Sequence, residues 1–131
     1  MKILVFGNPL VKKDSLPLKL LPELRKNFPS ITFKEFDAVE DLQKEGRNLI
    51  ILDTVKGIQN ACLLNLNSIK IDKIYSLHDF DLGYSLKLLK KLDKIDNAKI
   101  IAVPMNIDEK KALNQVHLIL RKCVAQLMQG S

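Results

Sequence analysis

The sequence predicts an α/β fold, a three-layer α/β/α sandwich built on a mostly parallel five-stranded sheet with one antiparallel strand. Short runs of consecutive apolar residues recur along the chain, which is typical of strands buried on both faces. Segments with apolar residues at three-to-four spacing separate most of these runs, as helices do when they connect parallel strands. One pair of runs lies too close together for such a helix, which indicates an antiparallel strand. Residues 1–131 are therefore expected to form a single domain.

The first half of the chain is expected to form a strand, a helix, a strand, a short helix and a strand, over residues 2–6, 16–24, 31–36, 39–44 and 49–52. Gly7-Asn8-Pro9 stops the first apolar run in a loop. Pro17 suits the first turn of the helix that follows, because proline gives up no hydrogen bond there. Gly46 is expected to end the short helix. The third strand is apolar throughout, so we expect it to be central and to end at Asp53.

The second half is expected to form an antiparallel edge strand, a helix, a last strand and a closing helix. The strands cover residues 61–66 and 99–103, and the closing helix covers 113–127. The first helix carries Leu82, Leu86 and Leu89, and its apolar spacing leaves open whether it extends to Ile95. Residues 69–75 are compatible with either an extended piece or a loop. Leu82 and Leu86 share one face of the first of these helices, which predicts that this face is buried. Asn106 or Asn114 is the expected cap of the closing helix.

The composition narrows the range of possible partners and cellular locations. The 131 residues carry a net charge of +6, and 47% of them are hydrophobic, as in an ordinary globular protein. The lysines are spread over helix faces and only 5% of the residues are aromatic, so we expect no nucleic-acid partner. No apolar run approaches the roughly 20 residues of a membrane span, and the start lacks the apolar core of a signal peptide. We therefore expect a cytoplasmic protein with no membrane partner. Cys62 and Cys123 match no metal or redox spacing and are expected to be small buried hydrophobes.

Three polar side chains stand next to predicted buried elements. Asp14 follows the first strand, Asp53 ends the third strand, and His78 precedes the helix that carries Leu82. In a doubly wound sheet the first and third strands can be neighbours where the strand order reverses, and ligands bind at their carboxyl ends. Two carboxylates and an imidazole suit a divalent metal such as nickel or zinc, and three protein ligands leave coordination positions open. Taken singly, each residue has a simpler interpretation, as a turn cap, a helix N-cap or a surface histidine.

Three segments, taken in order, carry motifs of a known family. Residues 3–10 with Asp14 are similar to an opening Gly-Asn-x-Leu-x-x-Asp-Asp/Glu pattern. Residues 49–55 are similar to an apolar strand ending in Asp-Ala-Val, and residues 76–82 to a Ser-x-His segment before a leucine-rich helix. In this order they resemble the hydrogenase maturation endopeptidases, which remove a C-terminal extension from the large subunit of nickel–iron hydrogenases. The last strand and helix fit the family more loosely, so the resemblance covers nearly the whole chain.

The resemblance implies that Asp14, Asp53 and His78 occupy the metal-contacting positions of the family, with Asp14 and Asp53 as catalytic carboxylates. The metal is nickel already installed in the substrate, and zinc or cadmium can substitute for it. Cleavage is then conditional on metal loading. Water is the expected nucleophile, since no Ser/His or Cys/His pairing indicates a covalent mechanism. Either a carboxylate such as Asp14 activates this water or the metal polarises it. The expected partner is the hydrogenase large-subunit precursor, and the chain is expected to act as a monomer.

The chain departs from the family pattern at four places. Lys13 stands where relatives carry the first acid of a pair, and Ser15 stands where many have glycine. Asp37-Ala38-Val39-Glu40 replaces a glycine-rich Asp-Gly-Gly-Thr stretch, and the Pro-Gly turn after the third strand is missing around Asn60. These departures keep a second hypothesis open, a non-catalytic, metal-dependent binding or chaperone-like relative. A nucleotide- or phosphate-binding module is disfavoured, because the chain has no GxGxxG or Walker glycine run.

Overall fold

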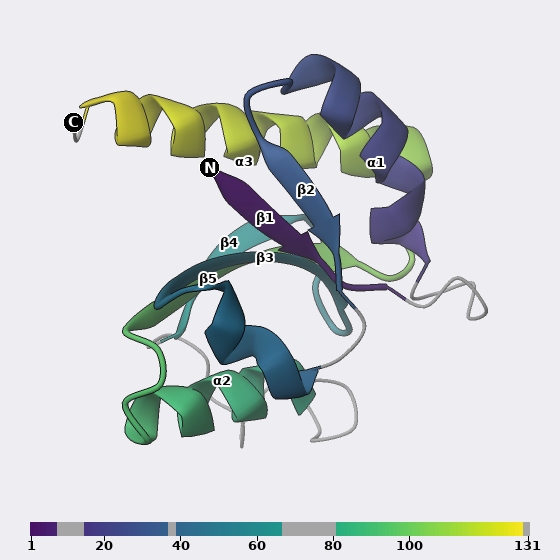
Figure 1. Cartoon of the computed structure of the whole chain (residues 1–131). Coiled ribbons are helices and arrows are strands. Elements are labelled where there is room, and N and C mark those ends of the chain that lie inside the picture. Colours follow the sequence, from purple (N-terminus) through teal and green to yellow (C-terminus); the bar gives the residue numbers. More distant parts are fainter. Residues whose placement is uncertain (8–14, 37–38, 67–80, 130–131) are drawn as a thin grey trace.

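A twisted sheet with helices on both faces makes up the protein (Figure 1). The computed structural model describes residues 1–7, 15–36, 39–66 and 81–129. Within these residues the strands are β1 to β5, over Lys2–Val5, Thr32–Glu35, Asn48–Val55, Cys62–Asn65 and Asn97–Pro104. The helices are α1, η1, α2 and α3, over Leu16–Asn27, Val39–Glu45, Asp81–Lys91 and Glu109–Gln129. The short helix η1 is a 3-10 helix. The predicted α/β/α sandwich is confirmed.

The strands follow the order β2-β1-β3-β5-β4. β1 pairs in parallel with both β2 and β3, and β3 pairs in parallel with β5. β4 runs antiparallel to β5 at one edge, as its short connection from β3 predicts. The prediction that the first and third strands are neighbours is therefore confirmed, and the strand order reverses between them.

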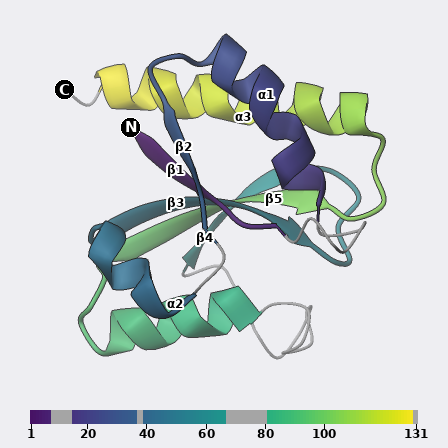
Figure 2. The same ribbon diagram turned by 45° about the vertical axis from the view of Figure 1, so that its right-hand side comes forward.

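Alternating side chains of the strands fill two separate cores. In β1, Ile3 and Val5 pack with α1 and α3, whereas Leu4 and the following Phe6 pack with η1 and α2. Figure 2 shows these two helix layers on opposite sides of the sheet. Burial of one such side chain contributes about 1.5–3 kcal/mol to stability. Both faces of β1 are thus apolar because both are covered, which explains the uninterrupted apolar run in the sequence.

The third strand is longer than predicted. β3 continues through Thr54 and Val55, so the prediction that Asp53 ends the strand was wrong, and this residue lies inside it. The extension forms because Thr54 and Val55 are β-branched and pair with Val103 and Pro104 of β5. Asp53 itself is level with Ala102 of the same strand. Its position along β3 is therefore set by strand pairing and not by a turn.

Helix α2 contains Leu82, Leu86 and Leu89, as predicted, but does not extend to Ile95. It ends at Lys91, and the chain turns at Asp93, whose φ of 58° is uncommon for a residue other than glycine. Ile95 reaches the core from the loop that follows, with an exposed fraction of 1%. Arg47 holds this turn, because its guanidinium donates to the carboxylates of Asp93 at 2.7 Å and Asp96 at 2.9 Å. Ile95 is therefore apolar because it is buried, although it does not belong to the helix.

The cap of α3 is Asp108. Its carboxylate accepts the main-chain N–H of Lys111 at 3.1 Å, and its C=O accepts the N–H of Ala112 at 2.8 Å. These bonds satisfy donors that have no partner inside the first turn of the helix. Asn106 lies two residues too early and Asn114 lies within the helix, so the prediction of either residue as the cap was wrong.

β1 and β3 separate toward their amino ends. Their ladder contains only the pairs Leu4↔Ile51 and Val5↔Leu52, whereas β3 pairs with β5 along its whole length. Figures 1 and 2 both show the start of β1 well apart from the start of β3, while the carboxyl ends run together. The sheet is thus closed at one end of this strand pair and open at the other.

Candidate functional site

The closed end of the β1–β3 pair is where the sequence predicts the site. The main-chain N–H of Phe6 donates to the C=O of Leu52 at 2.9 Å, directly after the last ladder pair. Asp53 is the next residue along β3. In open α/β sheets, side chains that bind ligands gather at the carboxyl ends of the strands where the strand order reverses. The described position of Asp53 agrees with that rule.

Asp53 lies on the face of the sheet that η1 and α2 cover. Ile51 and Val55 belong to the core on this face, and strand alternation places Asp53 between them. Its side chain is half-buried, and its Oδ1 accepts the main-chain N–H of Thr54 at 2.9 Å. Such a bond orients a carboxylate, as hydrogen bonds to metal-ligating groups commonly do. The geometry therefore fits a ligand role for this residue.

Two aromatic rings line the carboxyl edge on the same face. Phe6 and Phe36 follow β1 and β2, and their ring centroids lie 5.6 Å apart with an interplanar angle of 60°. Both rings pack against the core that contains Ile51. The ammonium of Lys34 lies 5.8 Å from the centroid of the Phe36 ring. This part of the edge is therefore largely apolar, which strengthens the electrostatic interactions of a carboxylate nearby.

Two of the three predicted ligands lie outside the described residues, Asp14 in the segment 8–14 and His78 in the segment 67–80. Within the described ranges, no three His, Cys, Asp or Glu side chains gather as a metal site requires. A site at Asp53 would therefore take its other ligands from those two segments. The meeting of the three side chains around one ion stays a prediction.

The loop after β3 is fastened to α3 by a residue that sequence reasoning missed. The Oε1 of Gln115 accepts the main-chain N–H of Ala61 at 2.7 Å, and its Nε2 donates to Oδ1 of Asn60 at 3.0 Å. Gly57, earlier in the loop, has a φ of 91° that favours glycine. This loop stands where the resembled family has a Pro-Gly turn. A glutamine on a helix flank carries no sequence signal for such a role.

The two cysteines are free thiols in different parts of the fold. Cys123 of α3 is buried, as predicted, and Cys62 of β4 is only partly buried. Burial raises the pKa of both thiols, and the ammonium of Lys99 partly offsets this rise at Cys123. A thiol with a raised pKa stays protonated near neutral pH and is a poor nucleophile and metal ligand. Neither cysteine is therefore a candidate for a reactive site of its own.

A cavity of about 600 Å³ lies at the open end of the β1–β3 pair, away from the predicted site. Its lining includes Lys2 of β1, Leu49 and Ile50 of β3, and Lys99 of β5. Asp53, further along β3, is not among the lining residues. The described part of the chain thus offers a second place where a ligand can bind.

Comparisons with known proteins inform the fold alone. No family model and no curated protein matches the chain. Among solved structures, it is similar to an uncharacterized protein from Wolinella succinogenes, with 14% sequence identity and a TM-score of 0.57. The similarity covers 99% of this chain and 98% of that chain, so the α/β fold is shared over the whole length. Within the described ranges, no helix is long and apolar enough to cross a membrane.

Proposed function

We propose that the protein is a metal-dependent processing endopeptidase of the hydrogenase maturation type, which removes the C-terminal extension of a nickel-loaded large-subunit precursor. The observation that carries this proposal is the position of Asp53 beside the carboxyl end of β1, where the strand order reverses. The order of motifs in the sequence supplies Asp14 and His78 as its partners.

In this proposal the nickel belongs to the substrate. The carboxylates of Asp14 and Asp53 and the imidazole of His78 complete the coordination of an ion that the precursor already holds, and such an ion accepts oxygen and nitrogen ligands. Recognition of the metal brings the scissile peptide bond into place, so that a precursor without metal is not cut. Water then adds to the carbonyl carbon, and either Asp14 takes up its proton as general base or the substrate's metal polarises it. The peptide C–N bond breaks as a proton passes to the leaving amine.

A non-catalytic relative that binds the metal-loaded precursor is the second candidate. One observation favours it, namely that η1 begins at Val39, within the segment 37–40 that replaces the glycine-rich stretch of the resembled family. Glu45 at the end of η1 accepts hydrogen bonds from Lys2 at 2.6 Å and from Lys34, which fastens η1 to β1 and β2. A fastened helix adapts to a substrate less readily than a glycine-rich loop does. For both candidates we propose a cytoplasmic monomer, in keeping with the free thiols.

Calorimetry with nickel or cadmium tests the metal site. We expect binding of about one ion per chain, because the three predicted ligands form a single site. Asp53→Ala and His78→Ala are expected to abolish binding. The matched controls are Glu23→Ala, at an exposed position of α1, and His117→Ala on α3, and both are expected to bind as the unaltered chain does. Unchanged binding in Asp53→Ala would contradict the site.

Incubation with nickel-loaded precursor separates the two candidates. An endopeptidase shortens the precursor, whereas a non-catalytic relative leaves it at full length in a stable complex. Cleavage in the first case, or complex formation in the second, is expected to disappear in Asp53→Ala and to persist in Glu23→Ala. A precursor that the protein neither cuts nor binds would overturn both candidates.

A further inference from the structure

The cavity at the open end of the β1–β3 pair, which we call the β1–β3 cleft, has the size of a ligand pocket. Its volume of about 600 Å³ lies within the range of roughly 300–1,000 Å³ that small-ligand sites occupy. Its walls include Lys2 and Leu4 of β1 and residues 48–50 of β3. On the η1 side the wall is Glu45, whose carboxylate is paired with Lys2 and Lys34. It lies at the opposite end of the strand pair from Asp53, so what it binds does not depend on the proposed function.

Both walls of the cleft direct main-chain groups into it. Successive residues of a parallel strand point their N–H and C=O groups to alternate sides. The C=O of Leu52 accepts from β1, so Asn48, four residues earlier on β3, points the same way. The N–H of Phe6 donates to β3, so Lys2, four residues earlier on β1, also points its main-chain groups toward β3. The ladder begins only at Leu4↔Ile51, and each wall therefore presents a strand edge to the cleft.

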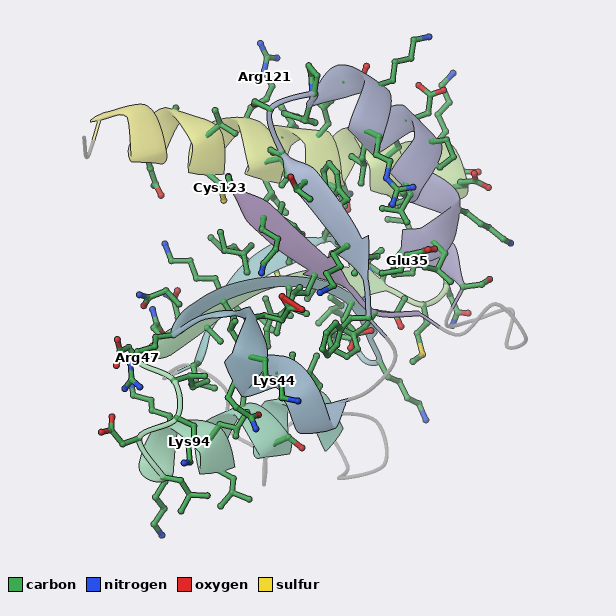
Figure 3. All side chains as sticks on the ribbon, viewed as in Figure 1. Glu35, Lys44, Arg47, Lys94, Arg121 and Cys123 are labelled. Carbon is green, nitrogen blue, oxygen red and sulfur yellow. The ribbon has the colours of Figure 1, made fainter. Side chains whose placement is uncertain are left out.

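Lys99 marks the deep end of the cleft. In the β3–β5 ladder it is level with Ile50, the residue directly before the first residue of β3 that pairs with β1. Within the described ranges, no carboxylate lies at ion-pair distance from its ammonium, whereas Lys2 is held by Glu45 at 2.6 Å. Cys123 of α3, which Lys99 influences electrostatically, points from the helix toward the start of β1 (Figure 3). The cleft therefore ends at a partly exposed cation that has no ion-pair partner among the described residues.

We propose that the β1–β3 cleft binds the C-terminal end of an extended peptide, which enters parallel to β1 and β3 and places its carboxylate against Lys99. The two strand edges hydrogen-bond to the peptide main chain, as in other cases of strand addition. Met1 and Ile50, which line the cleft and keep exposed apolar surface, contact its side chains. The direction of entry follows from Lys99 lying at the closed end, because the carboxylate is the last group of the peptide.

The length of the bound segment follows from the walls. Residues 48–50 span the distance from the start of β3 to the level of Lys99. At about 3.3 Å per strand residue, roughly three peptide residues lie between the mouth and Lys99. Asn97 and Gln126 also line the cleft and supply amide groups that can bond to a peptide main chain. The net charge of +6 further favours an anionic ligand.

Titration of the whole isotope-labelled chain with a synthetic hexapeptide tests this proposal. The peptide alternates threonine and valine and has an acetylated amino end and a free carboxylate. Heteronuclear NMR is expected to show saturable shifts at the amides of Lys2, Asn48, Ile50 and Lys99. The same peptide with an amidated end is expected to bind at least about tenfold more weakly, because a charge-assisted hydrogen bond is lost. A peptide N-methylated at alternate residues is expected not to bind, because one main-chain edge is blocked.

Lys99→Met supplies the matching change in the protein, and Lys94→Met, at an exposed lysine before β5, is its control. We expect Lys99→Met to weaken binding of the free-carboxylate peptide about tenfold and Lys94→Met to leave it unchanged. Equal binding of the free and amidated peptides would overturn the proposal, and that comparison does not depend on the folding of any variant. Binding of the N-methylated peptide would also overturn it, since a carboxylate would then suffice without strand addition. Absence of shifts up to millimolar peptide would overturn it as well.

Discussion

The two ends of the β1–β3 pair differ in shape and in charge. The carboxyl end is closed by main-chain pairing from Leu4↔Ile51 onward, and it carries the half-buried carboxylate of Asp53. The amino end is open, with a cavity of about 600 Å³ and the ammonium of Lys99 at its deep end. One end therefore carries an anion, where we propose a metal site, whereas the other carries a cation and strand edges, where we propose that a peptide binds.

The difference shows that strand register decides where space opens in this sheet. β1 stays with β2 over four pairs, from Lys2↔Thr32 to Val5↔Glu35. β3 stays with β5 along its whole length. Because adjacent strands of a sheet are rotated relative to one another, two firmly paired halves can diverge where their shared ladder is short. The cleft is thus a consequence of two pairings that are each longer than the one between them.

The largest expected effect is on the free energy of unfolding, and it compares a core leucine beside the β1–β3 cleft with one away from it. Leu52 and Leu4 are both almost fully buried, but only Leu4 lines the β1–β3 cleft. Leu52→Ala removes contacts on every side and is expected to cost about 3–4 kcal/mol of unfolding free energy, whereas Leu4→Ala, with space already on one side, is expected to cost about 2 kcal/mol. Urea unfolding measures both. Equal losses would indicate that the cleft is closed in solution.

Sequence reasoning succeeded where the local pattern and the fold demand the same residues. The apolar run at residues 2–6 predicts a strand covered on both faces, and β1 is such a strand. The short connection before Cys62 predicts the antiparallel edge strand β4. Sequence reasoning failed where strand pairing or helix capping overrides the local residue pattern. At Thr54 and Val55 of β3, pairing with β5 carries the strand past its predicted end.

The candidate site could be predicted only in part. The location of Asp53 beside β1 follows from strand order, which the sequence constrains strongly through its crossover pattern. Asp14 and His78 lie outside the described residues, and their meeting with Asp53 stays a prediction. The β1–β3 cleft could not be predicted at all. No residue type marks it, because it arises from the register of β1 with β3.

A smaller effect is expected at the carboxyl edge. Gln115→Ala removes two hydrogen bonds to the loop after β3, one with Ala61 and one with Asn60, and is expected to cost about 1–2 kcal/mol. Amide hydrogen exchange at Ala61 is expected to accelerate, while exchange at the start of β3 stays unchanged. Lys122→Ala, at an exposed position of the same helix, is the control. An unchanged Ala61 amide would show that the loop is held by something other than Gln115.

The smallest effect is expected at the amino end and depends on pH. Hydrogen bonds from Lys2, and after it Lys34, lower the pKa of Glu45 from its ordinary value of 4.5. A carboxyl with a lowered pKa in the folded state stabilises the protein above pH 4.5, and this contribution is lost as the pH falls through the lower folded value. The thermal midpoint of Glu45→Gln is therefore expected to fall less between pH 5 and pH 3 than that of the unaltered chain. Glu35→Gln, at an exposed position of β2, is the control and is expected to behave as the unaltered chain does. Equal pH profiles of Glu45→Gln and Glu35→Gln would contradict the idea that the ion pairs of Glu45 hold η1 against β1 and β2. Other contacts would then have to keep η1 in place beside the β1–β3 cleft.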